Sequence, residues 1–329
     1  MIRKSYLVTG GTGFIGAALV RKLVAEGCRV RVLDNDSRGR RHRLSDLEGK
    51  IEIVTADIRD PEAVRKAALG MDSVLHLAFI NGTEFFYNRP KDVLDVGVRG
   101  MLNVLDACQD AGIRELVLAS SSEVYQTPPA IPTDESAPLS VPDPLNPRYS
   151  YGGGKIISEL LAINWGRSEF DRVLIFRPHN VYGPDMGWEH VLPQFVLRMK
   201  EQVAQSDADP LPFPIQGDGS ETRAFCHIDD FAEGIMVMLR HGQHLNIYHV
   251  GTMEEVSMRH AAELAGAYFK RRLNLIPGPL QVGGTLRRCP DIAKLAKLGY
   301  APRVSLAEGL PDLAHWYDAN AHLKPTARA

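Results

Sequence analysis

The feature that most constrains the fold is a glycine-rich turn between an apolar, strand-like run and a helical stretch. Residues 6–9 form the run, the turn reads Gly10-Gly11-Thr12-Gly13-Phe14-Ile15-Gly16, and helical periodicity continues to about residue 26. Gly10 permits a tight turn, Gly13 lets the backbone approach an anion closely, and Gly16 allows close strand–helix contact. The start of the helix also offers free N–H groups and the positive end of its dipole. The turn therefore predicts a pyrophosphate site, although a glycine-rich turn without a ligand is the simpler alternative.

Short β-rich runs and longer helical patterns alternate through the first 177 residues. Such alternation predicts a parallel sheet with right-handed crossovers and helices on both faces. We therefore expect an α/β fold with a Rossmann-type, doubly wound parallel sheet. The further strands are expected at residues 30–33, 51–54, 73–77, 116–119 and 173–176, and the helices near 61–69, 90–111 and 150–168.

The pattern changes after Arg177, where proline and glycine become more frequent. We expect residues 1–177 to form a nucleotide-binding domain and residues 178–329 mainly a smaller, mixed α/β substrate domain. Helical patterns recur near 190–201, 229–240, 257–271 and 305–319, with short strand signals at 225–228 and 246–250.

Composition excludes several classes of function. The formal net charge is −2, and only residues 38–43 approach a basic run, so nucleic-acid binding is not expected. No apolar stretch reaches the roughly 20 residues of a membrane span, and the first residues lack a secretion signal. We expect a cytoplasmic protein without a metal site, since the cysteines are widely spaced and contain no CxxC pair. They are Cys28, Cys108, Cys226 and Cys289, of which the first two are expected in the core.

Carboxylates follow the second and third expected strands. Asp34 lies where a carboxylate accepts both hydroxyls of an adenosine ribose and repels a 2′-phosphate, which favours NAD over NADP. Arg38 is close enough to weaken that preference, or to close over bound phosphates. Asp57 and Ile58 end the third strand, where they either meet an adenine or cap a loop.

The spacing Gly-x-x-Gly-x-x-Gly, with Leu33-Asp34-Asn35, Asp57-Ile58-Arg59 and His76-Leu77-Ala78, resembles the extended short-chain dehydrogenase/reductase family. The resemblance implies an NAD-dependent enzyme that acts on a nucleotide-diphosphate sugar. It assigns the cofactor to the following set: Gly10, Gly13, Phe14, Ile15, Gly16, Asp34, Asn35, Arg38, Asp57, Ile58, Leu77, Ala78, Tyr151 and Lys155.

Tyr151 and Lys155 are four residues apart in a helical pattern, so they share one face. A tyrosine with a pKa of about 10 is a poor base at neutral pH. A nearby ammonium and a positive nicotinamide ring favour the phenolate and lower that pKa. The pair is therefore the expected catalytic base, with a surface pair as the plain alternative.

A serine cluster, Ser120-Ser121-Ser122-Glu123, ends the strand at 116–119. By resemblance, Ser121 is the catalytic serine, and Ser122 lies beside the substrate or bonds its own backbone. Glu123 is expected to be catalytic, because many 4,6-dehydratases and glucuronate decarboxylases of the family carry Glu there. Its alternative is a loop cap.

Further segments resemble the family's sugar-nucleotide site. Asn180 and His190 are expected near the substrate, and Arg223 and Arg288 are expected to grip its diphosphate. His190 replaces a typical asparagine of 4-epimerases, and Gly97 replaces an asparagine usual in the family. Residues 200–214 carry additional proline-rich sequence.

The expected reaction removes a proton and a hydride from the sugar C4 and gives a 4-keto intermediate. We favour 4-epimerisation, because residue 122 is Ser rather than the Asp of common dehydratases, and no arginine is dedicated to a C6 carboxylate. Dehydration and decarboxylation remain alternatives because of Glu123. A catalytically silent NAD-sensing protein is the alternative from another class.

The helical patterns near 90–111 and 150–168 carry more apolar positions than one core-facing stripe needs. We therefore expect a homodimer built on these helices, the alternative being that they only cover the sheet. The positions are Val93, Leu94, Val98, Met101, Leu102, Leu105, Cys108, Ile156, Ile157, Leu160, Leu161 and Trp165.

Overall fold

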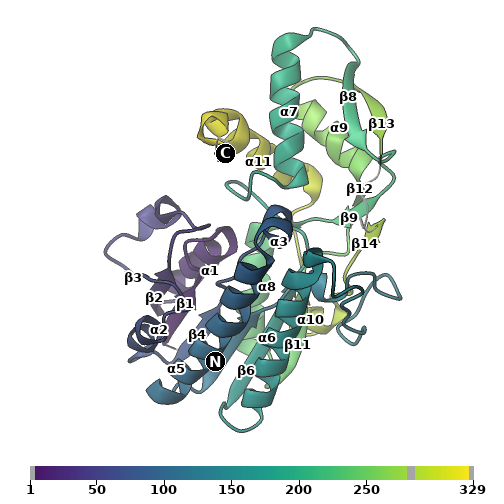
Figure 1. Cartoon of the computed structure of the whole chain (residues 1–329). Coiled ribbons are helices and arrows are strands. Elements are labelled where there is room, and N and C mark those ends of the chain that lie inside the picture. The colour runs from purple at the N-terminus through teal and green to yellow at the C-terminus, as the bar shows by residue number, and fades with distance from the viewer. Residues whose placement is uncertain (1–3, 280–285, 326–329) are drawn as a thin grey trace.

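The structure, a computed structural model, describes residues 4–279 and 286–325. Its centre is a seven-stranded sheet in which all neighbouring strands are parallel (Figure 1). The strands in spatial order are β11 (Asn246–Val250), β6 (Arg172–Pro178), β5 (Glu115–Ala119), β4 (Ser73–His76), β1 (Ser5–Thr9), β2 (Arg29–Asp34) and β3 (Glu52–Thr55). The expected Rossmann-type α/β fold is confirmed.

Helices cover both faces of this sheet, and the alternation of side chains along each strand divides the core in two. In β1, Tyr6 and Val8 join the cluster under α1 (Phe14–Ala25) and α8 (Ile228–His241), whereas Leu7 joins the opposite cluster. That second face lies under α2 (Pro61–Ala68), α5 (Gly100–Ala111) and α6 (Ser150–Gly166). Cys28 and Cys108 are buried, as expected.

Two short helices, α3 (Thr83–Asn88) and α4 (Pro90–Leu94), precede α5. One π-helical turn, η2 (Asp95–Arg99), joins α4 to α5. The helical pattern expected near 90–111 is thus nearly continuous but changes its winding at residues 95–99. Such π-turns are frequent at functional sites.

The second unit stands beyond the sheet and has its own apolar core (Figure 1). Its helices are α7 (Val191–Gln205), α9 (Met258–Tyr268) and α11 (Leu306–Asn320), and its short strands are β7 (Val181–Tyr182), β8 (Leu211–Gln216), β9 (Thr222–Ala224), β10 (Cys226–His227), β12 (Glu255–Ser257), β13 (Leu273–Gly278) and β14 (Arg287–Arg288). The small helix α10 (Ala293–Ala296) packs beside α8 and β11.

The chain leaves the large sheet after β6 and later returns to it. Strand β11 pairs with β6, and α8 covers one face of the sheet, although both follow residue 177. The expected boundary at 177 therefore marks only the first crossing between the two units. The returning strand carries a short apolar signal, which does not itself identify the sheet that it joins.

The proline-rich sequence between 200 and 214 ends in a strand. In β8, Leu211, Phe213 and Ile215 are buried, while Pro212 and Pro214 between them are exposed. In the part of the chain that the structure describes, β8 pairs only with β13, so each proline can turn its missing N–H away from the ladder. Within residues 4–279 and 286–325, no helix combines the length and apolarity needed to cross a membrane.

Candidate functional site

The glycine turn links β1 to α1 and fits a closely approaching ligand. Gly10 has φ +74°, and a Cβ there would lie 2.7 Å from the backbone N of Ala78. A Cβ on Gly16 would overlap the carbonyl oxygen of Gly10. Phe14 and Ile15 open α1 behind the extended N-cap Gly13. The glycines therefore leave the backbone at the start of α1 free of side chains, so that a pyrophosphate can approach its N–H groups closely.

Asp34 ends β2 next to this turn. Its carboxylate accepts the Thr12 N–H at 3.1 Å and the Asp36 N–H at 2.9 Å, which fixes it beside the turn. Asn35 donates to Asp57 at 3.0 Å. A carboxylate held in this way keeps unused lone pairs for two ribose hydroxyls.

Other residues expected at the cofactor have structural partners as well. Asp57 forms an ion pair with Arg59 at 2.8 Å, which agrees with the loop-supporting alternative for this residue. Ile58 is buried against Gly100, where a Cβ would collide with it. The Leu77 and Ala78 amides donate to the Thr9 hydroxyl at 3.2 and 3.3 Å, so β4 and β1 meet beside the turn.

Arg38 reaches away from the turn toward α3. Its guanidinium lies 4.6 Å from the Phe85 ring centroid, and burial lowers its pKa. His190 is the N-cap of α7, and burial lowers its pKa, with Arg38 adding to the effect. The two residues therefore approach one another from the two units of the molecule.

Tyr151, Lys155 and Ser121 meet at the carboxyl end of β5. Lys155 is buried in α6 and donates to the Ala119 carbonyl at 2.6 Å. The Tyr151 hydroxyl bonds Ser121, whose hydroxyl also accepts the Glu123 N–H at 3.1 Å. The expected catalytic set is therefore brought together from β5, the turn that follows it and α6.

The pKa values of this set differ from the sequence-based expectation. Burial raises the pKa of Tyr151 to about 12, which the hydrogen bond from Ser121 only partly offsets. Burial also lowers the pKa of Lys155 to about 7, against the pull of Glu159. In the chain alone, desolvation outweighs the expected effect of the ammonium on the phenol.

Glu123 faces the second unit. Its Oε1 accepts from Arg288 at 2.6 Å, and both side chains are mostly buried. Burial opposes ionisation of Glu123, but the attraction of Arg288, aided by Arg148 and Arg223, holds the pKa of this carboxyl below its ordinary value. The group is therefore an anion held among three guanidinium groups.

Arg223 and Arg288 come from segments far apart in sequence. They are direct partners in the parallel pairing of β9 with β14, so the two predicted diphosphate ligands lie side by side. Asn180, at φ +40°, donates weakly to the Ala224 carbonyl at 3.4 Å, next to Arg223. Ser122 is buried in the 3₁₀ turn η3 (Ser122–Val124). Arg288 connects this strand pair to Glu123 in the same turn as Ser122.

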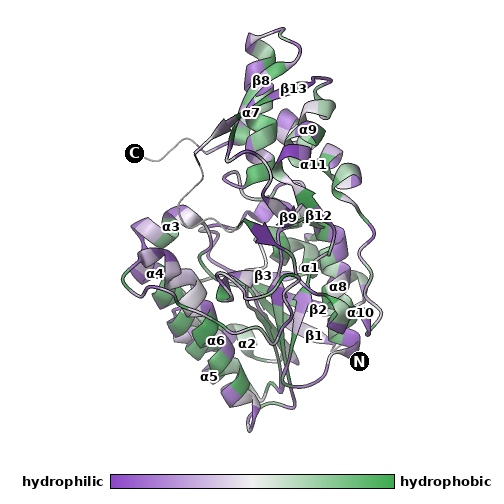
Figure 2. Ribbon diagram, turned by 90° about the vertical axis from the view of Figure 1, so that its right-hand side faces the viewer, coloured by the Kyte–Doolittle hydropathy of each residue, from purple (hydrophilic) through white to green (hydrophobic). Residues whose placement is uncertain are grey.

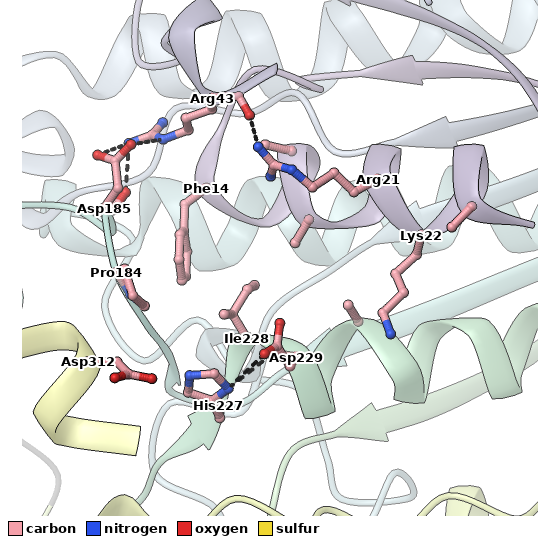
Figure 3. A pocket seen from close by; sticks show the side chains of 14 residues that line it. Phe14, Arg21, Lys22, Arg43, Pro184, Asp185, His227, Ile228, Asp229 and Asp312 are labelled. Carbon is pink, nitrogen blue, oxygen red and sulfur yellow. Dashed lines mark hydrogen bonds and ion pairs between the residues drawn. The ribbon is translucent and has the colours of Figure 1, made fainter. Parts of the chain in front are cut away.

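A separate cavity of about 640 Å³ lies between α1 and α8 (Figure 3). Arg43 and Asp185 bridge one side of it at 2.8 Å, and His227 and Asp229 lie on the other. Among the described residues that line it, Phe14 is the only predicted site residue. The side chain of Phe14 therefore faces away from the catalytic set, and only its backbone belongs to the turn.

Sequence reasoning missed two aromatic neighbours of Tyr151. Phe86 stacks on its ring at a centroid distance of 4.8 Å, and Phe79 meets it edge-on at 5.2 Å. The Lys155 ammonium also lies 4.0 Å from the Phe79 ring centroid. The aromatic density of residues 79–87 was the available signal.

Comparison with known proteins identifies the family of the chain. The model of the NAD dependent epimerase/dehydratase family matches residues 6–251. The chain is 31% identical over 314 residues to UDP-glucuronic acid decarboxylase 1 of Arabidopsis thaliana, covering 94% of this chain and 68% of that protein.

Two solved structures with bound NAD share the fold. The dTDP-glucose 4,6-dehydratase DesIV of Streptomyces venezuelae is 30% identical with a TM-score of 0.82, covering 97% of this chain and 98% of that one. The UDP-glucose 4-epimerase of Thermus thermophilus is 27% identical with a TM-score of 0.81, covering 95% and 98%. The protein belongs to the NAD-dependent epimerase/dehydratase family, whose members are NAD-dependent enzymes acting on nucleotide sugars.

Proposed function

We propose that the protein oxidises C4 of a nucleotide-diphosphate hexuronic acid, removes its C6 carboxylate as CO₂ and then reduces C4 again. The observation that supports this choice is the Arg288–Glu123 pair, at 2.6 Å, beside the Tyr151–Ser121 hydrogen bond. The sequence alone offered no arginine for a C6 carboxylate. Arg288, which the family resemblance assigned to the diphosphate, is proposed instead as that arginine, and Arg223 keeps the proposed diphosphate role.

The first step needs a base at the C4 hydroxyl. Tyr151 takes this proton, and Ser121 hydrogen-bonds the same oxygen and orients it. Bound NAD⁺, held by the glycine turn, Asp34 and Lys155, would supply the hydride acceptor. The ammonium of Lys155 lowers the cost of forming the Tyr151 phenolate once the positive nicotinamide is also present.

The second step follows from the chemistry of the 4-keto sugar. Its C6 carboxylate is β to the C4 carbonyl, so the C5–C6 bond breaks, CO₂ leaves, and the electron pair forms a C4–C5 enolate. A solvent-derived proton then adds to C5, the hydride taken from C4 returns to C4, and Tyr151 returns its proton to the C4 oxygen. Arg288 binds the carboxylate before it leaves, and Glu123 fixes the guanidinium in place.

The second candidate is the 4-epimerase that the sequence favours. Ser122 supports it, because the common dehydratases carry Asp at this position, and so does the fold shared with UDP-glucose 4-epimerase. This reaction returns the hydride to the opposite face of C4, and Glu123 moves no proton. Ser121, Tyr151 and Lys155 are buried together at the carboxyl end of β5, which argues against a catalytically silent NAD-sensing protein.

Product mass and isotope content separate these candidates. The purified protein is incubated in D₂O with UDP-, GDP-, CDP- and dTDP-hexoses and with their hexuronic acids. Decarboxylation gives a pentose nucleotide with one deuterium at C5, and dehydration gives a 4-keto-6-deoxy sugar. Epimerisation gives an isomer without carbon-bound deuterium. Turnover of neutral hexoses alone would overturn the decarboxylase proposal, and no turnover of any nucleotide sugar would remove both candidates.

A further inference from the structure

The spacer between Tyr151 and Lys155 consists of three glycines, Gly152, Gly153 and Gly154, inside a helix. Each glycine lowers helix stability by about 1 kcal/mol relative to alanine in a helix interior. We therefore ask which neighbouring groups occupy the space that a side chain would fill. At Gly152 a Cβ would lie 2.9 Å from the Glu123 carbonyl oxygen. At Gly154 it would lie 3.1 Å from Cζ of Phe79, whereas Gly153 has only ordinary contact at 3.6 Å.

Gly97, on the π-turn η2, clears the space on the other side of the same ring. A Cβ on Gly97 would lie 2.5 Å from Cε2 of Phe79. The Ser158 hydroxyl ties the two glycine backbones together, with oxygen distances of 2.9 Å to Gly154 and 3.5 Å to Gly97. Phe79 therefore occupies a slot between α6 and η2 that requires glycine at position 97, while Gly154 gives the ring additional room on its other side.

The seated ring contacts both members of the expected catalytic pair. Its face lies 4.0 Å from the Lys155 ammonium, and its edge meets the Tyr151 ring at 5.2 Å. A desolvated ammonium over an aromatic face is stabilised more than an exposed one, because water no longer competes for the charge. The Ala119 carbonyl, at 2.6 Å, is the other group that holds this ammonium.

We propose that Phe79 is a positioning residue, which uses its ring face to keep the Lys155 ammonium charged and directed at Tyr151. The role depends on the proposed function, in which Tyr151 is the base. Of the three glycines in the spacer, only Gly154 borders the Phe79 ring.

The charged groups around Lys155 make the effect of the ring measurable. His76 of β4 lies close by, but burial lowers its pKa to about 3, so it stays neutral in the working range. Glu159, one turn further along α6, favours the ammonium, and Tyr151 completes the titratable surroundings. Removing the ring therefore shifts the protonation equilibrium of Lys155 toward the neutral amine. Because less positive charge then lies near Tyr151, the pKa of Tyr151 rises.

The first test titrates Lys155 in the protein without cofactor or substrate, through its ¹³Cε NMR signal, assigned by its loss in Lys155→Arg. Phe79→Leu keeps bulk but removes the aromatic face, and it should lower the titration midpoint by about one pH unit. Phe86→Leu is the matched control, because Phe86 stacks on Tyr151 and contacts no cation in the described part of the chain. An unchanged midpoint in Phe79→Leu would overturn the proposal, whatever the enzyme's substrate proves to be.

The second test separates electrostatics from packing. Gly97→Ala displaces the ring and should reduce kcat, while Gly153→Ala should leave turnover unchanged. The double variant Gly97→Ala/Phe79→Leu relieves the clash. It should recover thermal stability but keep an acid limb of kcat/KM moved up by about half to one pH unit. Full recovery of the pH profile in this double variant would show that Phe79 acts through packing alone, and would contradict the proposal.

Discussion

At the residue scale, the site depends on how each charge is paired. Asp34 is held by two backbone N–H groups, and Glu123 is held by Arg288. Both are carboxylates of the candidate site, but one is held by the backbone and the other by a guanidinium. We propose that Asp34 selects the cofactor and that Glu123 fixes a guanidinium beside the reacting sugar.

Asp34→Asn should narrow the preference for NAD⁺ over NADP⁺, because the repulsion of a 2′-phosphate is lost while the side-chain shape is kept. Isothermal titration with both cofactors measures this difference. Asp36→Asn is the control, since that carboxylate binds Thr12 and Arg41 instead. Stronger binding of NADP⁺ than of NAD⁺ by the unaltered protein would refute the assignment.

Tyr151→Phe should reduce turnover by orders of magnitude while substrate binding is largely kept, because only the base is removed. Glu123→Gln should approach that loss if Arg288 must be held for a C6 carboxylate. In a simple 4-epimerase its effect should be modest. Steady-state kinetics of the two variants distinguish the two reactions. Arg288→Lys is the reference variant, because it keeps the positive charge but loses the paired N–H donors of the guanidinium.

At the element scale, a buried ion pair fastens α6 to β6 below the catalytic residues. Arg177 and Glu159 meet at 2.6 Å with side-chain exposures of 2% each, and Glu159 also accepts from Ser120. Because α6 carries Tyr151 and Lys155, we expect the Arg177–Glu159 ion pair to fix the position of Tyr151 relative to Ser121. Breaking a buried pair leaves an uncompensated charge in the core.

Glu159→Ala should therefore lower the free energy of unfolding by about 3–5 kcal/mol, measured by urea denaturation. Asp110→Ala, which removes an exposed partner of Arg65, is the control and should cost far less. Equal losses in the two variants would show that the Arg177–Glu159 pair does not fasten α6.

Local patterns predicted most of the elements but not every contact between them. The strand at 116–119 and the helix at 150–168 were readable from periodicity, and family spacing identified Tyr151 and Lys155. The Glu123–Arg288 pair was not readable, because it joins residues 165 positions apart across two units. The slot for Phe79 could not be predicted from the sequence either, because Gly97 and Gly154 border the same ring only once α6 packs against η2.

At the scale of the whole molecule, α6 carries apolar side chains that the described chain covers only in part. Leu160 is 54% exposed and Ile157 is 39% exposed, one turn apart on the same face. Figure 2 shows hydrophobic stretches on both α5 and α6. A second copy of the chain is the occupant expected from the sequence, through the helices near 90–111 and 150–168.

Light scattering at micromolar concentration should give the mass of a dimer, and Leu160→Arg should convert it to a monomer. Leu69→Arg, at a comparably exposed leucine after α2, is the control and should leave the mass unchanged. A monomeric mass for the unaltered protein would contradict the prediction.

The return of β11 to the edge of the large sheet has a consequence for synthesis. When residue 177 has emerged from the ribosome, β6 still lacks its outer neighbour, and one face of the sheet still lacks α8. The nascent chain therefore exposes the edge of β6 until about residue 250 is available, and until α8 is made it also exposes the part of the core that this helix covers. The edge of the large sheet is thus completed only after much of the second unit has been made.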